Sequence, residues 1–461
     1  MCRFVPDKEK GRVKHMTDII FSFDTEDFTS NITADAIYRE AEILREEGVR
    51  GGFCLVGLLT EQLQNWGRTD IIGALKHHDI LTHSYSHSVH PTINELTDLK
   101  DFDAAYHNIF EQEKKALSMI KAFTGGADIC GVVTPGNNIS YVGSYVFADL
   151  GLPINSGSAC DTVDSRGAFF CNAYHTRYNF EMETFHEQSD DAFMKKTLDE
   201  LSKRDRAVIC THPNRAIAKE FWDQINYNGE NQYEFGKWAE SPYYTEEEIE
   251  AFYDAIRRFV RMVKNDKRFR VTSYGELADK IRSLDARVIR KEELPAIKEQ
   301  LEKDFWPIAH PSYCISDVFL ACMEMLRGKT SHTCGKVYGF LETPYAAEHE
   351  VTVTKEELIA SAKTMDCQRF LPEKIRVGSH DIGPADWLMA ALTVLCGEDT
   401  AVVSPKEQMP NPDILGDVKT MDLKLDGTYV WPPQSRDFKD EYLSDRMRLQ
   451  TWTTRFMETG V

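Results

Sequence analysis

The sequence predicts an α/β protein whose sheet is parallel and covered by helices on both faces, followed by a smaller, mostly helical α+β domain. Short apolar runs alternate with amphipathic stretches over the first part of the chain. None of these runs alternates apolar with polar residues, which is typical of strands buried on both faces. The roughly six to eight units fit a closed or partly closed (β/α) barrel, with an open doubly wound sheet as the alternative.

The elements follow in a regular order. The apolar runs predict strands at 18–24, 52–57, 79–82, 129–133, 207–211 and 269–272. The stretches between them predict helices at 33–48, 68–78, 101–123, 141–150, 191–203, 245–264 and 274–283. The first helix has Thr33 at its N-cap position and Gly48 just past its end, as helix signals require. Polar residues gather directly after several strands, where parallel α/β folds place their sites.

The chain is too long for one ordinary domain, with 461 residues. Its composition shifts to a charged helical stretch between Lys291 and Lys303, and we place the domain boundary just before that stretch. The predicted organisation is an N-terminal extension at 1–16, a catalytic α/β domain at 17–285 and an accessory domain at 286–461.

The accessory domain contains a weak internal repeat with an offset of 69 residues, as between Asp317 and Asp386 or between Gly328 and Gly397. Each unit predicts a Pro-led extended segment and then a helix of about 12 residues that ends at a glycine. The Pro-led segments are 305–307 and 370–372. The tail at 415–433 predicts short strands with a turn at Asp426-Gly427.

Charge excludes two classes of partner. The formal net charge is −20, so the chain has no excess of Lys and Arg for nucleic acid or for an anionic membrane. A carbohydrate or a small acylated molecule is compatible with it. No secretory signal and no apolar stretch of spanning length is visible. The 11 Cys include no CxxC pair and are predicted to be reduced in a cytoplasmic protein.

Three carboxylates crowd the end of the first predicted strand. Asp24, Glu26 and Asp27 lie within four residues. Such crowding is unfavourable unless a cation lies among the side chains or one of them stays protonated. The alternative is that Asp24 and Asp27 are helix caps or solvated loop acids.

Histidines follow two further strands. His83 and His87 come after 79–82, spaced so that one turn brings both rings to one side, and His212 follows 207–211. Two His and one carboxylate with open positions left over are a typical catalytic zinc set. Hydrolysis of an amide at neutral pH also needs a proton acceptor and a proton donor. The alternatives are surface histidines around a Ser-rich turn and a buried structural His212.

These segments resemble the polysaccharide deacetylase family, the NodB-homology hydrolases. The resemblance covers about the first 280 residues and rests on three segments, at 23–28, 83–87 and 210–212. It implies a distorted (β/α) barrel and a divalent metal, most often zinc. It also implies Asp24 as catalytic base, His83 and His87 with either Glu26 or Asp27 as metal ligands, and His212 as general acid.

One segment departs from the family pattern. The family often has an Arg-x-Pro motif that supports the base, but here Thr134 precedes Pro135 in place of Arg. Arg215, just after His212, is the candidate to take over this catalytic role, and the alternative is that the base is tuned differently. The aromatic and polar residues at 221–223, together with Tyr227, are candidates for a sugar site or for packing.

The resemblance leaves the substrate open. The leading hypothesis is a metal-dependent amidase that deacetylates an N-acetylated sugar. The alternatives are a hydrolase of small cyclic amides, in which metal can be absent, and a non-catalytic glycan-binding protein. The accessory domain more weakly resembles pseudomurein-binding repeats, which implies glycan binding. Its alternative roles are homo-oligomerisation and covering of the barrel.

Overall fold

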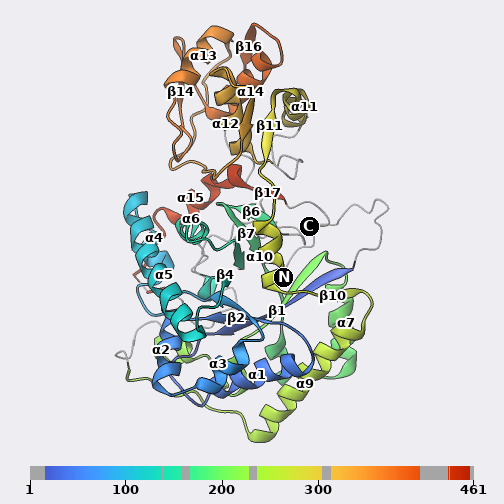
Figure 1. The fold of residues 1–461 in the computed structure, drawn as a ribbon. Coiled ribbons are helices and arrows are strands. Elements are labelled where there is room, and N and C mark those ends of the chain that lie inside the picture. The colour runs from blue at the N-terminus through green and yellow to red at the C-terminus, as the bar shows by residue number, and fades with distance from the viewer. Residues whose placement is uncertain are drawn as a thin grey trace.

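The computed structural model describes residues 16–137, 140–156, 167–227, 236–303, 313–404, 434–435 and 437–456. A large sheet with its helices forms the lower part of the molecule, and the segment after about residue 285 forms the upper part (Figure 1). The predicted extension at 1–16 and the predicted turn at 415–433 lie almost entirely outside the described residues, as does the first Pro-led segment. Within the described part, no helix has both the length and the hydrophobicity to cross a membrane.

The main sheet is mostly parallel. Its hydrogen-bonded order is β17-β6-β7-β5-β4-β3-β2-β1-β9-β8, with β10 beside the start of β1. The bounds are β1 Thr17–Thr25, β2 Gly52–Leu55, β3 Asp79–Thr82, β4 Ile129–Val133, β5 Ile154–Ser156, β6 Ala168–Phe170, β7 Ala173–Thr176, β8 Tyr178–Glu181, β9 Arg206–Thr211, β10 Phe269–Val271 and β17 Arg455–Phe456. All six predicted strands are confirmed. β5 to β8 and β17 were not predicted.

The parallel α/β class is therefore confirmed, whereas barrel closure is not observed. Among the described strands, no pairing joins β8 at one end of the sheet to β6 or β17 at the other. The helices of this part are α1 Ala34–Glu46, α2 Gly57–Asn65, α3 Thr69–Leu75, α4 Ile93–Thr97, α5 Phe102–Thr124, α6 Tyr141–Asp149, α7 Asp191–Leu201, α8 Trp222–Tyr227, α9 Glu246–Asn265 and α10 Tyr274–Arg282. Short 3-10 turns lie at η2 Met182–His186 and η3 Pro213–Ala216.

The two faces of β1 explain its uninterrupted apolar sequence. Phe21 and Phe23 pack into the core between the sheet and the outer helices. Ile20 belongs to the separate inner core with Tyr274 of α10. Because side chains alternate along a strand, Asp24 lies on the same inner face as Ile20. The strand thus buries a carboxylate on the face of the sheet that carries Ile20, where Asp24 is 3% exposed.

The upper part contains two units in the same order of elements. The first has β11 Val288–Arg290, α11 Leu294–Lys303, α12 Ile315–Leu326 and β12 Ser331–Thr333; the second has β13 Val351–Thr354, α13 Lys355–Thr364, α14 Pro384–Leu395 and β16 Thr400–Val403, with the hairpin β14 Ile375–Val377 and β15 His380–Ile382 inserted. In each unit the outer strands pair antiparallel. Helices α12 and α14 have bounds related by the 69-residue offset and end before glycines of positive φ. Glycan binding by these units stays a prediction.

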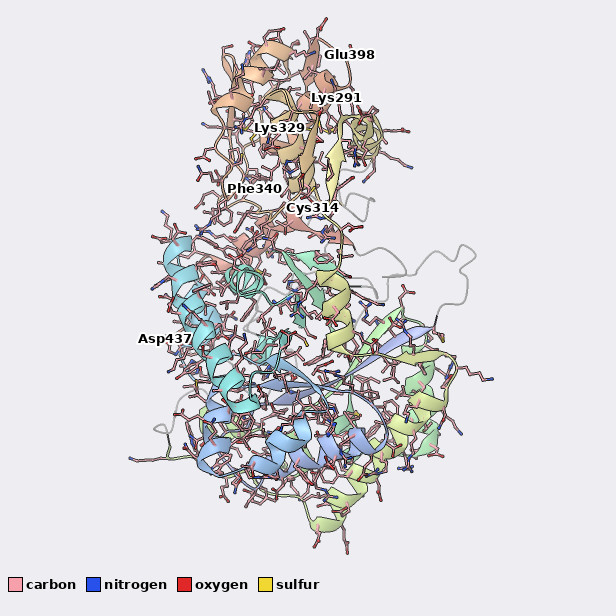
Figure 2. The ribbon with its side chains drawn as sticks, viewed as in Figure 1. Lys291, Cys314, Lys329, Phe340, Glu398 and Asp437 are labelled. Atoms are coloured by element: carbon pink, nitrogen blue, oxygen red, sulfur yellow. The ribbon has the colours of Figure 1, made fainter. Side chains whose placement is uncertain are left out.

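The C-terminal segment returns to the lower part of the molecule. Asp98, at the end of α4, accepts hydrogen bonds from the backbone N–H groups at 441–443, where α15 Leu443–Leu449 begins. Strand β17 then pairs with β6. Phe340, near the junction of the two parts (Figure 2), packs against Trp452 with ring centroids 4.8 Å apart. The C-terminal segment therefore adds a strand to the main sheet, and Phe340 and Trp452 belong to one hydrophobic cluster with Tyr141 and Tyr145 of α6.

Arg446 of α15 is central to this attachment, and its replacement by Met is expected to destabilise the fold by about 2–4 kcal/mol. Its side chain is 5% exposed and donates to the carbonyl groups of Leu99, Lys100 and Leu341. These acceptors would lose a charged donor. Urea unfolding measures the change. Arg448→Met is the matched control, because Arg448 is 46% exposed and pairs with Asp445, and we expect less than about 0.5 kcal/mol. Equal effects of the two substitutions would contradict this role.

Candidate active site

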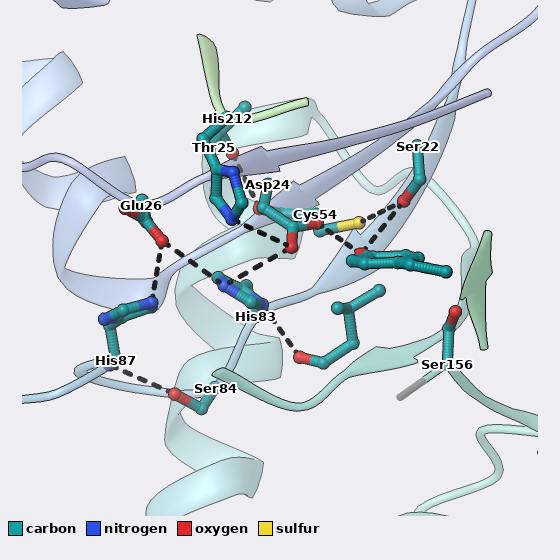
Figure 3. Close-up of polar contacts among 12 residues, drawn as sticks. Ser22, Asp24, Thr25, Glu26, Cys54, His83, Ser84, His87, Ser156 and His212 are labelled. Carbon is teal, nitrogen blue, oxygen red and sulfur yellow. Dashed lines mark hydrogen bonds and ion pairs between the residues drawn. The ribbon is translucent and has the colours of Figure 1, made fainter. Parts of the chain in front are cut away.

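Three strand ends bring the predicted residues together. Asp24 lies at the end of β1, His83 directly follows β3, and His212 directly follows β9. β1 pairs with β9 and with β2, which in turn pairs with β3, and all four strands run parallel. Their carboxyl ends therefore meet at one edge of the sheet, where parallel folds place their sites. Figure 3 shows the three side chains converging with Glu26 and His87.

Glu26, His83 and His87 form a compact group of buried ligand atoms, all within 4.8 Å of one another. Glu26 Oε2 lies 2.8 Å from His87 Nε2 and 3.9 Å from His83 Nε2. The other carboxylate oxygen, Oε1, is buried and has no hydrogen-bond partner among the described residues. Two imidazole nitrogens and a carboxylate with a free oxygen fit a divalent metal such as zinc.

The outer nitrogen of each imidazole ring is fixed by a partner behind it. His83 Nδ1 lies 2.8 Å from the carbonyl oxygen of Val133, which can only accept, so this nitrogen carries the proton. His87 Nδ1 lies 2.9 Å from Ser88 Oγ, which donates to Asp223 at 2.6 Å. Both rings therefore direct Nε2 toward Glu26. Such supporting hydrogen bonds are what orient histidine ligands in metal sites.

The loop that carries the two histidines is held in a demanding conformation. Ser84 and His87 have φ of 66° and 54°, the left-handed region that residues with a Cβ rarely adopt. The His87 N–H donates to Ser84 Oγ, and the Tyr85 N–H donates to the buried carboxyl of Glu113. Burial raises the pKa of Glu113 to about 7. The surrounding structure thus fixes a costly turn that places both rings on one side.

The charges of the ligand group are mutually dependent. Burial alone would lower the pKa of His87, but the carboxylates of Glu26 and Asp223 raise it to about 10. Burial opposes ionisation of Glu26, yet His87 and His212 lower its pKa well below the ordinary value. A buried carboxylate that is ionised beside two imidazoles is an environment in which a cation is stabilised.

Asp24 is oriented by Tyr178 of β8. The Tyr178 hydroxyl donates to Asp24 Oδ1 at 2.6 Å. Burial and the Asp24 charge raise the pKa of Tyr178 well above its usual value, so the hydroxyl stays a donor. Asp24 Oδ2 lies 3.8 Å from His212 Nε2 and 4.0 Å from His83 Nε2. This oxygen faces the space between the ligand group and His212, where a base would meet a water molecule.

His212 is paired on its other side with Glu183 of η2. Glu183 Oε1 accepts from His212 Nδ1 at 2.8 Å and also from the His212 backbone N–H. Burial would lower the pKa of His212, but Glu183 and Glu26 raise it well above the ordinary value. Burial of Glu183 would raise the pKa of its carboxyl, but the charge of His212 and the hydrogen bonds to it lower that pKa below the ordinary value. The pair keeps a protonated imidazole with Nε2 facing Asp24.

Two predicted residues lie outside this arrangement. The Asp27 carboxylate accepts from Thr29 and from the Thr33 hydroxyl, which organises the entry to α1. The structure places Glu26 beside the two histidines and Asp27 away from them, and metal binding by either carboxylate stays a prediction. Thr33, predicted as an N-cap, makes no cap hydrogen bond with its side chain. In the described residues Arg215 forms no ion pair with Asp24, and the group that contacts this carboxylate is the Tyr178 hydroxyl.

The aromatic segment at 221–222 divides into two roles. Trp222 is 2% exposed and packs against Phe28, with ring centroids 4.5 Å apart, so it is a packing residue. Phe221 is half-buried and meets the His212 ring edge-on at 5.0 Å. Both rings thus contact a histidine of the candidate site, since Trp222 also lies 5.7 Å from the His87 ring, but Phe221 is the less buried of the two.

Sequence reasoning missed Tyr178 and Glu183. Both lie in a segment for which no element was predicted, although Tyr178 and Phe180 alternate with polar residues as a strand does. Asp223, a candidate for a sugar site, lies behind His87 and accepts from Ser88. The alternation at 178–181 is the one signal that pointed to a further strand beside β9.

No family model matches the chain, and no curated protein matches it in sequence. Solved structures with some similarity include a proposed polysaccharide deacetylase from Mycobacterium smegmatis, with 14% identity, a TM-score of 0.39 and coverage of 60% of this chain and 93% of that one. A family 4 carbohydrate esterase from Streptomyces lividans in complex with acetate has 14% identity, a TM-score of 0.32 and coverage of 55% and 91%. The PuuE allantoinase has 12% identity, a TM-score of 0.37 and coverage of 58% and 90%. Similarity this low does not establish a family or an activity for this chain.

Proposed function

We propose that the protein is a metal-dependent hydrolase of non-peptide amide bonds that removes the acetyl group from an N-acetylated sugar or oligosaccharide. The observation that carries this proposal is the position of Asp24 Oδ2, between the Glu26, His83 and His87 group and His212 Nε2. A metal set, a carboxylate and a protonated imidazole are the three components that hydrolysis of an amide requires.

Each residue of the site has a separate role in the proposed reaction. A divalent metal held by Glu26, His83 and His87 supplies polarisation of a water molecule and of the acyl carbonyl. Asp24 Oδ2 accepts the proton of the attacking water, while Tyr178 holds the other oxygen and fixes the carboxylate plane.

His212 Nε2 gives its proton to the leaving nitrogen as the carbon–nitrogen bond breaks. Glu183 keeps the ring in the donating orientation. The proton taken up by Asp24 can then return to His212, since Asp24 Oδ2 and His212 Nε2 lie 3.8 Å apart. Acetate and the amine leave, and the two groups are restored.

A substrate panel tests the proposal. The zinc-loaded protein is incubated with N-acetylated sugars and with cyclic ureides and imides, and released acetate, free amine and ring-opened product are measured. We expect acetate and amine in equal amounts from an acetylated sugar, with loss of turnover after chelation and recovery with added zinc. Ring opening without metal would support the cyclic amide hydrolase instead. Glycan binding without turnover in a zinc-replete sample would support the binding protein.

A further inference from the structure

Arg215 carries a charge that nothing in the described part of the chain balances. Its guanidinium lies over the ring of Phe221, 4.7 Å from the centroid, and Nε is buried without a hydrogen-bond partner. No carboxylate of the described residues forms an ion pair with it. A partly desolvated charge without a partner is costly, and a fold keeps one when a ligand completes the site.

Four carboxylates of the candidate site already have partners of their own. Asp24 accepts from Tyr178, Glu26 pairs with His87, Glu183 pairs with His212, and Asp223 accepts from Ser88. The charges of these four groups are therefore offset within the site. The guanidinium of Arg215 is the charge left over for a ligand.

Arg215 lies close to the proton donor. The two groups contact the same ring, the guanidinium at 4.7 Å and the His212 imidazole at 5.0 Å from the Phe221 centroid, so their separation cannot exceed these two distances combined. The Arg215 backbone N–H also donates to the His212 carbonyl, which fixes the turn that joins them. A sugar whose amide nitrogen meets His212 would thus extend a neighbouring substituent toward Arg215.

We propose that Arg215 binds an anionic group, a carboxylate or a phosphate, carried by the acylated sugar substrate. This inference rests on the proposed function and narrows its substrate class. The planar guanidinium suits such groups because it donates two parallel hydrogen bonds to them. Stacking on Phe221 orients the fork before the ligand arrives, which lowers the entropy lost on binding.

Kinetics with matched substrates test the inference. The zinc-loaded wild type and Arg215→Met are compared on N-acetylglucosamine, N-acetylglucosamine 6-phosphate and N-acetylmuramic acid. We expect the wild type to have a higher kcat/KM on one of the two charged sugars than on the neutral sugar. Whether that sugar carries the phosphate or the carboxylate shows which anion Arg215 binds. Arg215→Met is expected to lose about 10- to 100-fold in kcat/KM on that substrate, mainly through KM, and less than about 2-fold on the neutral sugar.

Lys219→Met is the control, because it removes one positive charge from the exposed Lys219, which lies over Tyr244 rather than Phe221. Equal losses on charged and neutral sugars, or the same selective loss in the control, would overturn the assignment.

Calorimetric titration of the same sugars into the wild type and Arg215→Met separates binding from turnover. If the wild type hydrolyses none of them, the proposed function fails, and the assignment of Arg215 survives only if the charged sugar binds at least about 10-fold more weakly to Arg215→Met.

Discussion

Replacing His83 and His87 together by alanine is expected to remove the bound metal and to lower turnover by on the order of 10³-fold or more, since polarisation by a metal contributes several kcal/mol to the transition state. Both Nε2 atoms face Glu26, and without them a single carboxylate remains. Elemental mass spectrometry on protein purified without chelator or affinity tag gives the metal content. About one equivalent in the wild type and none in the variant is the expected result.

Two single substitutions test which of the neighbouring carboxylates binds the metal. Glu26→Gln is expected to weaken zinc binding by at least about 10-fold, because a ligand of the group loses its charge. Asp27→Asn is the matched control at the next position: its carboxylate serves Thr29 and Thr33, so metal content should be unchanged while the free energy of unfolding falls. Loss of metal in Asp27→Asn with retention in Glu26→Gln would reverse the assignment. A wild type that takes up no zinc would remove the metal mechanism.

The extent to which the sequence predicts this site follows from where each residue lies along the chain. Asp24 lies at the end of a mostly apolar run, and His83 and His212 directly follow predicted strands. Strand prediction and parallel packing together therefore place the three residues at one edge of the sheet. That inference needs only local patterns. It holds here because the strands are buried on both faces and their ends are marked by an abrupt change to polar residues.

The supporting residues could not be predicted in the same way. Tyr178 reaches Asp24 only because β8 pairs with β9 at the far end of the sheet, a pairing that depends on the whole topology. Glu183 is fixed by the 3-10 turn that follows. Their importance comes from contacts 154 and 29 residues apart in sequence, which no local signal records.

The choice between Glu26 and Asp27, in contrast, depends on residues that lie close to them in the sequence. Both carboxylates follow the same strand, and spacing alone does not separate them. The separation comes from the chain immediately after them, where Thr29 and Thr33 supply three donors to Asp27 and leave Glu26 to face the histidines. Short hydroxyl side chains near an acid are a visible pattern of an Asx-type turn, so this part of the site was readable from local chemistry.

His212→Asn is expected to reduce kcat by about 10²- to 10⁴-fold, the usual contribution of a general acid, while metal content stays near one equivalent. The reason is that His212 Nε2 faces Asp24, whereas the ligand group consists of Glu26, His83 and His87. Parallel measurement of turnover and metal content on the same preparation checks both halves of this expectation. A variant that also loses its metal would make His212 a ligand rather than the proton donor.

Glu183→Gln tests how that proton donor is tuned. Glu183 is the main group that raises the pKa of His212 against the effect of burial. A general acid works only while protonated, so activity falls as the pH rises through its pKa. Removing the Glu183 charge lowers this pKa, and the basic limb of the kcat/KM profile should therefore move to lower pH, with kcat reduced but metal retained. The neutral amide keeps a hydrogen-bonding group beside Nδ1, so a structural role alone would lower activity evenly across the profile. An unshifted basic limb would mean that His212 does not supply the proton that limits the reaction.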